Sequence, residues 1–304
     1  MHPDCAFLAF TNGTLVDEDF CQEMIRVKNF VPAISVEGFE GATDARRGEG
    51  TYQKVVKAMD LLRKNGLPFG VSCCFTSQNA DSIASVEFFD WLIEKGALFA
   101  WIFTYMPVGV HSPASLIPNP DQREYLYHFV RKMRSEKPLF TLDFQNDGEY
   151  VGGCIAGGRR YLHINSAGDV DPCVFVHYSN ANIREVSLLD ALRSPIFMEY
   201  YREQPFSDNL LKPCPLLENS GKLTEMVERA HAHSSDLEAK ETARELCDKT
   251  SQAAKEWAPY AKRLWNNPSD PLYAKRHETS DQGMAETDMH KFERLGRVRT
   301  HGEE

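Results

Sequence analysis

The sequence predicts an α/β fold in which helices cover a parallel β-sheet, followed by a small β-hairpin domain and a C-terminal tail. Three observations support this prediction. Apolar runs of strand length alternate with amphipathic stretches of helix length as far as Thr104. A glycine-rich segment with three cysteines follows at 152–215. After Leu223 the chain becomes charged and helical, and from 266 onward it is mostly polar.

Composition excludes several classes of protein. The 304 residues include 34 Lys and Arg against 44 Asp and Glu, a net charge of −10, which argues against a nucleic-acid partner. No run approaches the roughly 20 apolar residues of a membrane span, so we expect no membrane partner. The amino terminus lacks the basic region of an export signal. We therefore expect a cytoplasmic protein whose eight cysteines are thiols or metal ligands.

The first predicted strand, 5–10, is a continuous apolar run, which is typical of a strand buried on both faces. A helix over about 17–28 starts with acidic residues, which the positive end of the helix dipole favours. The second strand, 33–36, leads into the segment 37–50. This segment is rich in glycine and charge, so it is predicted to be a loop outside the core.

A second helix is defined by Val55, Met59 and Leu62, which share one face, and it ends at 65–66 in Asn-Gly. The remaining elements are a strand at 70–75, a helix at 81–95, a strand at 98–104 and a later helix at 121–134. The order βαβαβαβ predicts a parallel sheet with its ligands at the carboxyl ends of the strands. Four strands are too few to close a barrel, so an open, partial barrel is expected.

Three cysteines carry the clearest chemical signal. Cys154 and Cys173 enclose a predicted hairpin with its turn at 165–169, and a hairpin returns its two ends to the same place. Cys214, between two prolines, can supply a third thiolate. An iron-sulfur cluster and a zinc ion both fit this pattern, and His177 would complete a Cys3His zinc site. The alternative is that all three are small buried hydrophobic residues. The other five cysteines are expected to be structural.

Several motifs, in this order, closely resemble radical S-adenosylmethionine (radical SAM) enzymes over residues 3 to about 222. The stretches 11–14, 34–38, 43–50 and 71–79 resemble the middle strands of that family. The spacing Cys154-x13-Gly168-x4-Cys173, with Cys214, resembles its auxiliary-cluster domain of the SPASM or shorter twitch type. The resemblance implies a partial (β/α) barrel, reductive cleavage of SAM, and hydrogen abstraction from a substrate, with a peptide as one substrate class.

The resemblance also implies roles for individual residues. Ser35 and Glu37 would approach the SAM ribose, and Arg47 would pair with the carboxylate of its methionine part. Thr11 and Asn12 would line the same pocket. Cys154, Cys173 and Cys214 would hold one auxiliary 4Fe-4S cluster, its fourth iron open or bound by Cys247 or a non-cysteine group.

The sequence departs from the family in one respect that bears on activity. The CxxxCxxC motif that holds the catalytic cluster is absent, and the chain begins where the family has its third strand. We therefore expect a barrel without its first βα units that is unable on its own to cleave SAM. Three explanations remain open: a truncated gene model, a separately encoded CxxxCxxC segment as a partner, or a decayed enzyme that keeps only the auxiliary domain. The first strand would then present an unpaired edge and promote aggregation. A non-enzymatic zinc- or cluster-binding interaction module is the alternative function.

These expectations divide the chain into four regions. They are a partial radical SAM barrel at 1–145, a SPASM or twitch-like cluster domain at 150–222, a helical extension at 223–265 and a disordered tail at 266–304.

Overall fold

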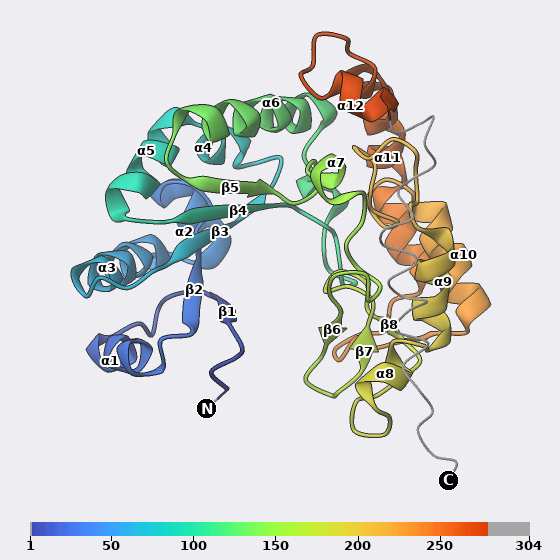
Figure 1. The fold of residues 1–304 in the computed structure, drawn as a ribbon, viewed down its shortest axis with the longest axis horizontal. Helices are drawn as coiled ribbons and strands as arrows, with labels where there is room; N and C mark the ends of the chain where they lie inside the picture. Colours follow the sequence, from blue (N-terminus) through green and yellow to red (C-terminus); the bar gives the residue numbers. More distant parts are fainter. Residues whose placement is uncertain (1, 279–304) are drawn as a thin grey trace. The chain divides into compact units, whose positions relative to one another are not determined.

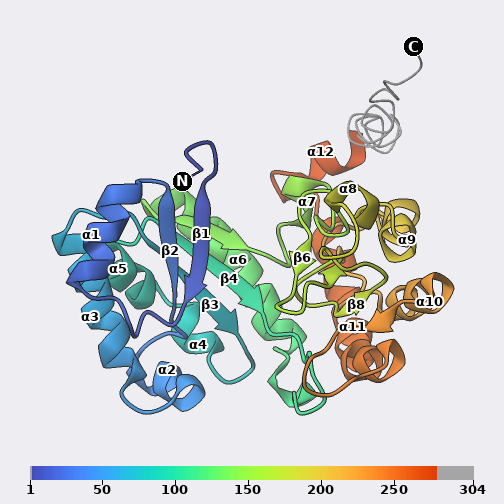
Figure 2. The same ribbon diagram turned by 90° about the horizontal axis from the view of Figure 1, so that it is seen from below.

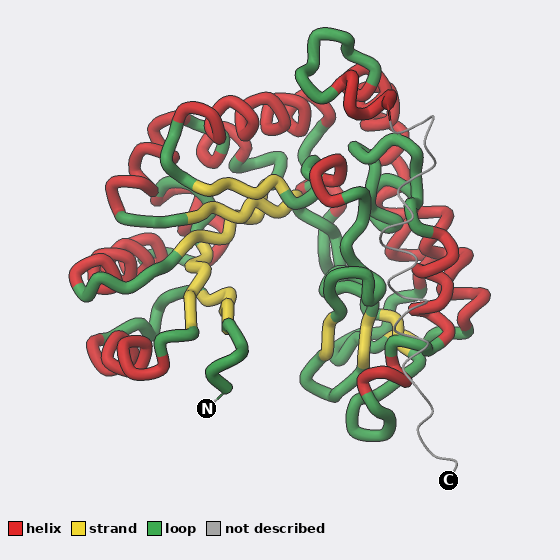
Figure 3. Tube along the Cα trace, viewed as in Figure 1, coloured by secondary structure: helices red, strands yellow, loops and turns green. Residues whose placement is uncertain are grey.

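The computed structural model describes residues 2–278. Its main feature is a five-stranded parallel sheet whose strands follow one another in chain order (Figures 1 and 3). The strands are β1 (Phe7–Thr11), β2 (Phe30–Ser35), β3 (Gly70–Phe75), β4 (Phe99–Thr104) and β5 (Phe140–Asp143). The four predicted strands are confirmed. The expected count of four is wrong, because β5 adds a fifth strand beside β4.

Helices connect the strands and cover one face of the sheet (Figure 2). They are α1 (Glu18–Val27), α2 (Glu40–Arg47), α3 (Thr51–Lys64), α4 (Ala80–Ile83), α5 (Val86–Lys95), the 3-10 turn η1 (Ala114–Leu116) and α6 (Pro120–Glu136). Met59 and Leu62 from α3 and Phe88 and Leu92 from α5 are fully buried in the core on this face. The predicted amphipathic face of α3 is confirmed, since Val55 belongs to the same core.

The opposite face of the sheet is concave. The rings of Phe10 on β1 and Trp101 on β4 lie 5.5 Å apart, although two strands separate β1 from β4. In a flat sheet these strands would be ~14 Å apart, at about 4.8 Å per strand. The sheet therefore curls strongly, as a partial barrel requires.

Three sequence predictions need correction. The first strand is not buried on both faces, since 46% of Phe7 and 52% of Phe10 are exposed; β1 lies at the edge of the sheet. The segment 37–50 is not a loop outside the core, because it contains α2 and buries Thr43. The predicted helix 81–95 is interrupted, because the Ser85 side chain accepts the amide of Phe88 and starts α5 anew.

The second part of the fold begins after α7 (Gly148–Val151). The predicted hairpin is present: β6 (His163–Ile164) pairs antiparallel with β7 (Val170–Asp171). In its turn Gly168 has a φ of +93°, and a Cβ there would lie 2.7 Å from the Asn182 Oδ1 atom. After β7 a tight turn at 173–176 brings the Val176 amide to the Cys173 carbonyl.

The remaining elements pack around this hairpin. They are β8 (Tyr178–Ser179), β9 (His233–Ser234), α8 (Leu188–Ala191), α9 (Pro195–Glu203), α10 (Ser220–Ala230) and α11 (Ala243–Trp265). Their apolar side chains form a second core that includes Val170, Phe197, Leu216 and Met226. None of the described helices is long and apolar enough to span a membrane.

The chain divides into two compact units, 1–260 and 261–304. In the second unit, α12 (Tyr273–Glu278) is held by Arg276, which donates to the Leu264 carbonyl and pairs with Asp270. The predicted disordered tail, 266–304, thus contains a helix in its first part. The rest of it, 279–304, lies outside the described residues.

Candidate metal centre and polar pocket

The fold brings the three predicted cysteines together from three segments. Cys154 follows α7, Cys173 follows β7, and Cys214 lies between α9 and α10. Burial and, to a smaller extent, the neighbouring Cys173 thiolate raise the pKa of Cys154 to about 12. The pKa of Cys214 is raised well above its usual range by burial, by Glu218 and by the other two thiolates. The three thiols are therefore close enough to influence one another's ionisation.

Backbone and side-chain donors point at two of these sulfur atoms. The Cys173 Sγ atom lies 2.7 Å from the Tyr161 hydroxyl and 3.5 Å from the Phe175 amide nitrogen. The Cys214 Sγ atom accepts the Leu217 amide at 3.4 Å. Such donors stabilise thiolate over thiol, which is the form that binds metal.

Zinc and a 4Fe-4S cluster require different arrangements of their ligands. Within residues 2–278, no three His, Cys, Asp or Glu side chains are grouped so that they could hold a metal ion. A zinc ion needs all its ligands within about 2.3 Å of one point, whereas each thiolate of a 4Fe-4S cluster binds a different iron atom.

His177, the fourth ligand of the zinc alternative, has both ring nitrogens engaged. Its Nδ1 atom lies 2.5 Å from Asp236 Oδ1, and its Nε2 atom lies 3.0 Å from the Val174 carbonyl oxygen. Cys247, another candidate fourth ligand, is buried in α11, where burial raises its pKa to about 11.

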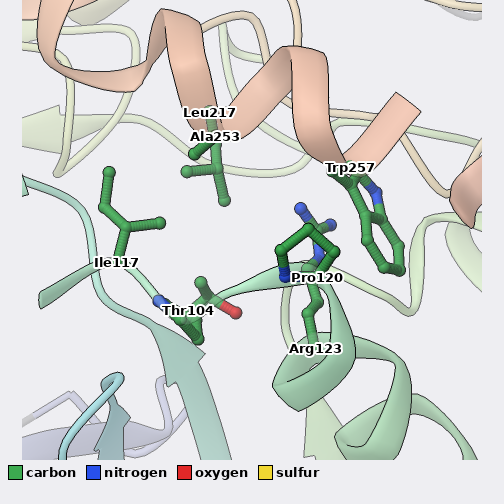
Figure 4. Close-up of a pocket in the computed structure, with 8 residues that line it drawn as sticks. Thr104, Ile117, Pro120, Arg123, Leu217, Ala253 and Trp257 are labelled. Atoms are coloured by element: carbon green, nitrogen blue, oxygen red, sulfur yellow. The ribbon is translucent and has the colours of Figure 1, made fainter. Parts of the chain in front are cut away.

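Glu218 was not predicted from the sequence, and it links the Cys214 segment to the barrel. Its Oε2 atom accepts the Cys214 amide at 2.8 Å, and its Oε1 atom lies 2.6 Å from Arg123 on α6. The Arg123 guanidinium also donates to Asn146 Oδ1 and lies 4.2 Å from the ring centre of Trp257. Figure 4 shows Arg123 reaching from α6 toward Trp257, beside a small pocket.

A second, open pocket lies beyond the carboxyl end of β1. It has a volume of about 510 Å³ and is lined by Asn12, Thr14, Arg46, Arg47 and Thr51. Two of the residues predicted to bind SAM, Asn12 and Arg47, therefore share one polar pocket.

The other predicted SAM-binding residues lie beside this pocket and are not among its lining residues. Thr11 accepts the Gly13 amide, and Ser35 ends β2. Glu37 is fully buried, and its Oε1 atom accepts the Arg47 Nε donor at 2.9 Å. Its Oε2 atom accepts the Cys74 amide at 2.7 Å, so this carboxylate holds Arg47 in place.

Aromatic rings connect the concave face of the sheet to the cysteine site. Phe10 contacts Trp101 and Phe103, and Phe103 in turn contacts Phe144 and Phe175. Phe175 lies two residues from Cys173 and donates its amide to that sulfur. The concave face is thus an apolar, aromatic surface that ends at the candidate metal centre.

Comparisons with known proteins agree with these observations. Residues 154–215 match the SPASM family, described as an iron-sulfur cluster-binding domain, and the match contains all three cysteines. The chain is 22% identical over 251 residues to the AdoMet-dependent heme synthase of Methanosarcina barkeri, covering 74% of this chain and 70% of the relative. It is 22% identical over 219 residues to the PqqA peptide cyclase of Granulibacter bethesdensis, covering 62% and 54%.

The fold also has a counterpart among solved structures. Native anSMEcpe with bound AdoMet (S-adenosylmethionine) aligns with a TM-score of 0.51 at 17% sequence identity, covering 86% of this chain and 76% of that chain. At this identity the likeness concerns the fold, and it confirms the predicted barrel-type α/β architecture.

Proposed function

We propose that this chain, a radical SAM-type protein with a SPASM domain, holds one auxiliary 4Fe-4S cluster on Cys154, Cys173 and Cys214. We further propose that the pocket containing Asn12 and Arg47 receives SAM. The observation that carries the proposal is the convergence of three thiols from separate segments within the SPASM match, Cys173 buried and Cys154 and Cys214 half-buried.

The donor set suits a cluster better than a zinc ion. Three thiols from separate segments that influence one another electrostatically suit a 4Fe-4S cluster, in which each thiolate binds a different iron atom. A Cys3His zinc site would require His177 to give up its contact with Asp236 or with the Val174 carbonyl. The fourth iron would then be open or bound by a non-cysteine group.

The polar pocket has the charge that a SAM carboxylate needs. Arg46 and Arg47 both pair with one buried carboxylate, that of Glu37. Two positive charges therefore face one negative charge, which leaves a net positive charge beside the pocket. A guanidinium held by one carboxylate keeps further donors for a second, and its planar fork suits carboxylate geometry. Asn12 and Thr14 add polar groups to the same pocket.

Bound SAM would supply the radical chemistry of hydrogen abstraction, for which the protein provides binding, orientation and shielding. In this chain Arg47 would orient the methionine end, and the aromatic concave face would keep water from the substrate. The name of the PqqA peptide cyclase supports a peptide as the substrate class. We retain the cytoplasm as the predicted compartment, because its reducing conditions keep thiols available.

These 304 residues contain no CxxxCxxC, so we propose that the chain on its own does not cleave SAM. A segment that carries this motif would be required, and we propose it as a partner of these 304 residues. The test is to incubate the reconstituted chain with SAM and dithionite and to assay 5′-deoxyadenosine. Its formation would contradict this part of the proposal.

The test of the cluster is the iron, sulfide and zinc content of the chain after anaerobic reconstitution. We expect about four irons with matching sulfide and a broad sulfur-to-iron absorption band. Cys173→Ala should lower the iron content and change the spectrum of what remains. A colourless protein with one zinc per chain would instead support the alternative, a zinc-binding interaction module.

His177→Ala separates the two metals within the same chain. In the cluster proposal this variant keeps its iron and sulfide, because His177 bonds to Asp236 and a carbonyl and not to the cluster. In the zinc alternative it loses a ligand and most of its metal affinity. Asp236→Asn, which changes the partner of His177 but keeps the imidazole, is the comparison. Loss of the metal in His177→Ala, with the metal content of Asp236→Asn unchanged, would favour zinc.

A further inference from the structure

Tyr200 on α9 carries a buried hydroxyl group without a partner. Only 1% of the residue is exposed, and among the described residues nothing hydrogen-bonds to its hydroxyl oxygen. Buried hydroxyls are normally satisfied, so an exception needs an explanation. The neighbouring Tyr178 shows the usual case, since its hydroxyl donates to the Glu241 carbonyl at 3.1 Å.

The surroundings of this hydroxyl are the candidate cluster site. Burial is the main cause that raises the pKa of Tyr200 well above its ordinary value, and the thiolates of Cys173, Cys154 and Cys214 raise it further. The phenol is therefore neutral and keeps its proton, and the Tyr200 side chain packs against Gly157 in the segment that follows Cys154. Tyr161 lies beside one of these thiols, with its hydroxyl oxygen 2.7 Å from the Cys173 Sγ atom.

The position of Tyr200 is fixed by close packing. Gly157, three residues after Cys154, has a φ of +67°, and a Cβ there would lie 2.5 Å from the Tyr200 Cβ atom. On another side the Phe206 ring packs edge-on, 5.4 Å away between ring centres. Gly157 and Phe206 therefore leave the Tyr200 side chain little room to change its conformation.

We propose that Tyr161 and Tyr200 donate hydrogen bonds to sulfur atoms of the auxiliary cluster: Tyr161 to the Cys173 thiolate, and Tyr200 to a sulfur that the loaded site provides. This inference rests on the proposed cluster. Hydrogen bonds to cluster sulfurs withdraw negative charge and so favour the reduced state, which raises the reduction potential. The unpartnered Tyr200 hydroxyl is then a preformed donor.

The test is the midpoint potential of the reconstituted cluster, measured by redox titration with electron paramagnetic resonance. Tyr200→Phe and Tyr161→Phe should each lower the potential, and the double variant should lower it further, with the iron content unchanged. Tyr178→Phe is the matched control. It also removes a hydroxyl buried in this core, but that hydroxyl donates to the Glu241 carbonyl. Its potential should equal that of the unaltered chain.

A second measurement keeps the shape of the side chain. Replacing Tyr200 by a 3-fluorotyrosine makes the phenol a stronger donor and should raise the potential. Unchanged potentials in both the fluorinated chain and Tyr200→Phe would overturn the role of Tyr200. If the unaltered chain takes up no cluster, the proposed function fails first; if it takes up the cluster and the potentials do not respond, only this inference fails.

Discussion

Glu37 shows how one buried carboxylate prepares a binding pocket. Its two oxygens are both used, one by the guanidinium of Arg47 and the other by the Cys74 amide at the end of the sheet. A fully buried carboxylate is stable only when it is paired and hydrogen-bonded, and both conditions are met here. Arg47 is thereby presented to the pocket in a defined orientation.

Glu37→Gln should lower the free energy of unfolding by about 2 kcal/mol, because it weakens charged hydrogen bonds in a buried place. It should also weaken SAM binding, since Arg47 loses its anchor. Urea unfolding and calorimetric titration with SAM measure the two effects. Glu40→Gln is the control, because Glu40 is exposed on α2 and accepts a hydrogen bond from the side chain of Gln53. Equal stability of the two variants would contradict the anchoring role.

At the scale of elements, a buried ion pair joins α6 to the segment that contains Cys214 and Glu218. Arg123 is 4% exposed and Glu218 is 5% exposed, and Glu218 also accepts the amide of Cys214. A movement of α6 would therefore be transmitted to Cys214, one of the three proposed cluster ligands. The pair lies next to Trp257 of α11, so three elements meet at one guanidinium.

Arg123→Met should lower the free energy of unfolding by about 3 kcal/mol, because it leaves the carboxylate of Glu218 buried without its partner. Adding Glu218→Gln to this variant should restore part of the loss, since the uncompensated charge is removed. Lys132→Met on the same helix is the control: the Lys132 side chain is 61% exposed and the change should be within about 0.5 kcal/mol. Denaturant unfolding of these three variants, of Glu218→Gln alone and of the unaltered chain completes the comparison, and additive losses for Arg123 and Glu218 would contradict their coupling.

The elements differ in how far the sequence could predict them. The strands at 70–75 and 99–104 are apolar runs that the helices bury, and both were predicted almost to the residue. β5 was missed because its four residues alternate in polarity and follow a long helix. α2 was missed because seven of its eight residues, all but Thr43, are not buried, so no apolar stripe marks it.

The candidate site was predictable to a similar degree. The three cysteines stood out by residue type and spacing, whereas Asn12 and Arg47 were predicted from the resemblance to radical SAM enzymes. Tyr200 and Glu218 could not be found in this way, because a tyrosine or a glutamate in a helical pattern is compatible with many environments. Only the folded chain shows that both are buried beside the thiols.

For the molecule as a whole, Asp143 introduces a dependence of stability on pH. This carboxyl at the end of β5 is fully buried, and burial, followed by the nearby Asp147, raises its pKa to about 6. In the unfolded chain its pKa is about 3.9. The folded state therefore holds the proton more tightly, and the stability that this provides is complete below about pH 4 and is lost as the pH rises through about 6.

Asp143→Asn should therefore remove one contribution to the pH dependence. Relative to the unaltered chain, the variant should gain about 1 to 3 kcal/mol of stability between pH 4 and pH 7. Thermal or urea unfolding across this range measures the difference. Asp60→Asn, at an exposed surface pair with Lys95, is the control and should show no such trend. If Asp143→Asn and the unaltered chain differed in their free energy of unfolding by the same amount at every pH in this range, the raised pKa would be contradicted.

The three cysteines come from segments that are far apart along the chain, separated by 155–172 and 174–213. A group bound to all three would close two loops at once, as a pair of covalent cross-links would. Such cross-links restrict the unfolded chain more than the folded one, and a ligand that binds only the folded chain stabilises it further. Cluster loading should accordingly protect the peptide bonds of 155–213 from proteolysis, so a protease digest would report occupancy without any spectroscopy.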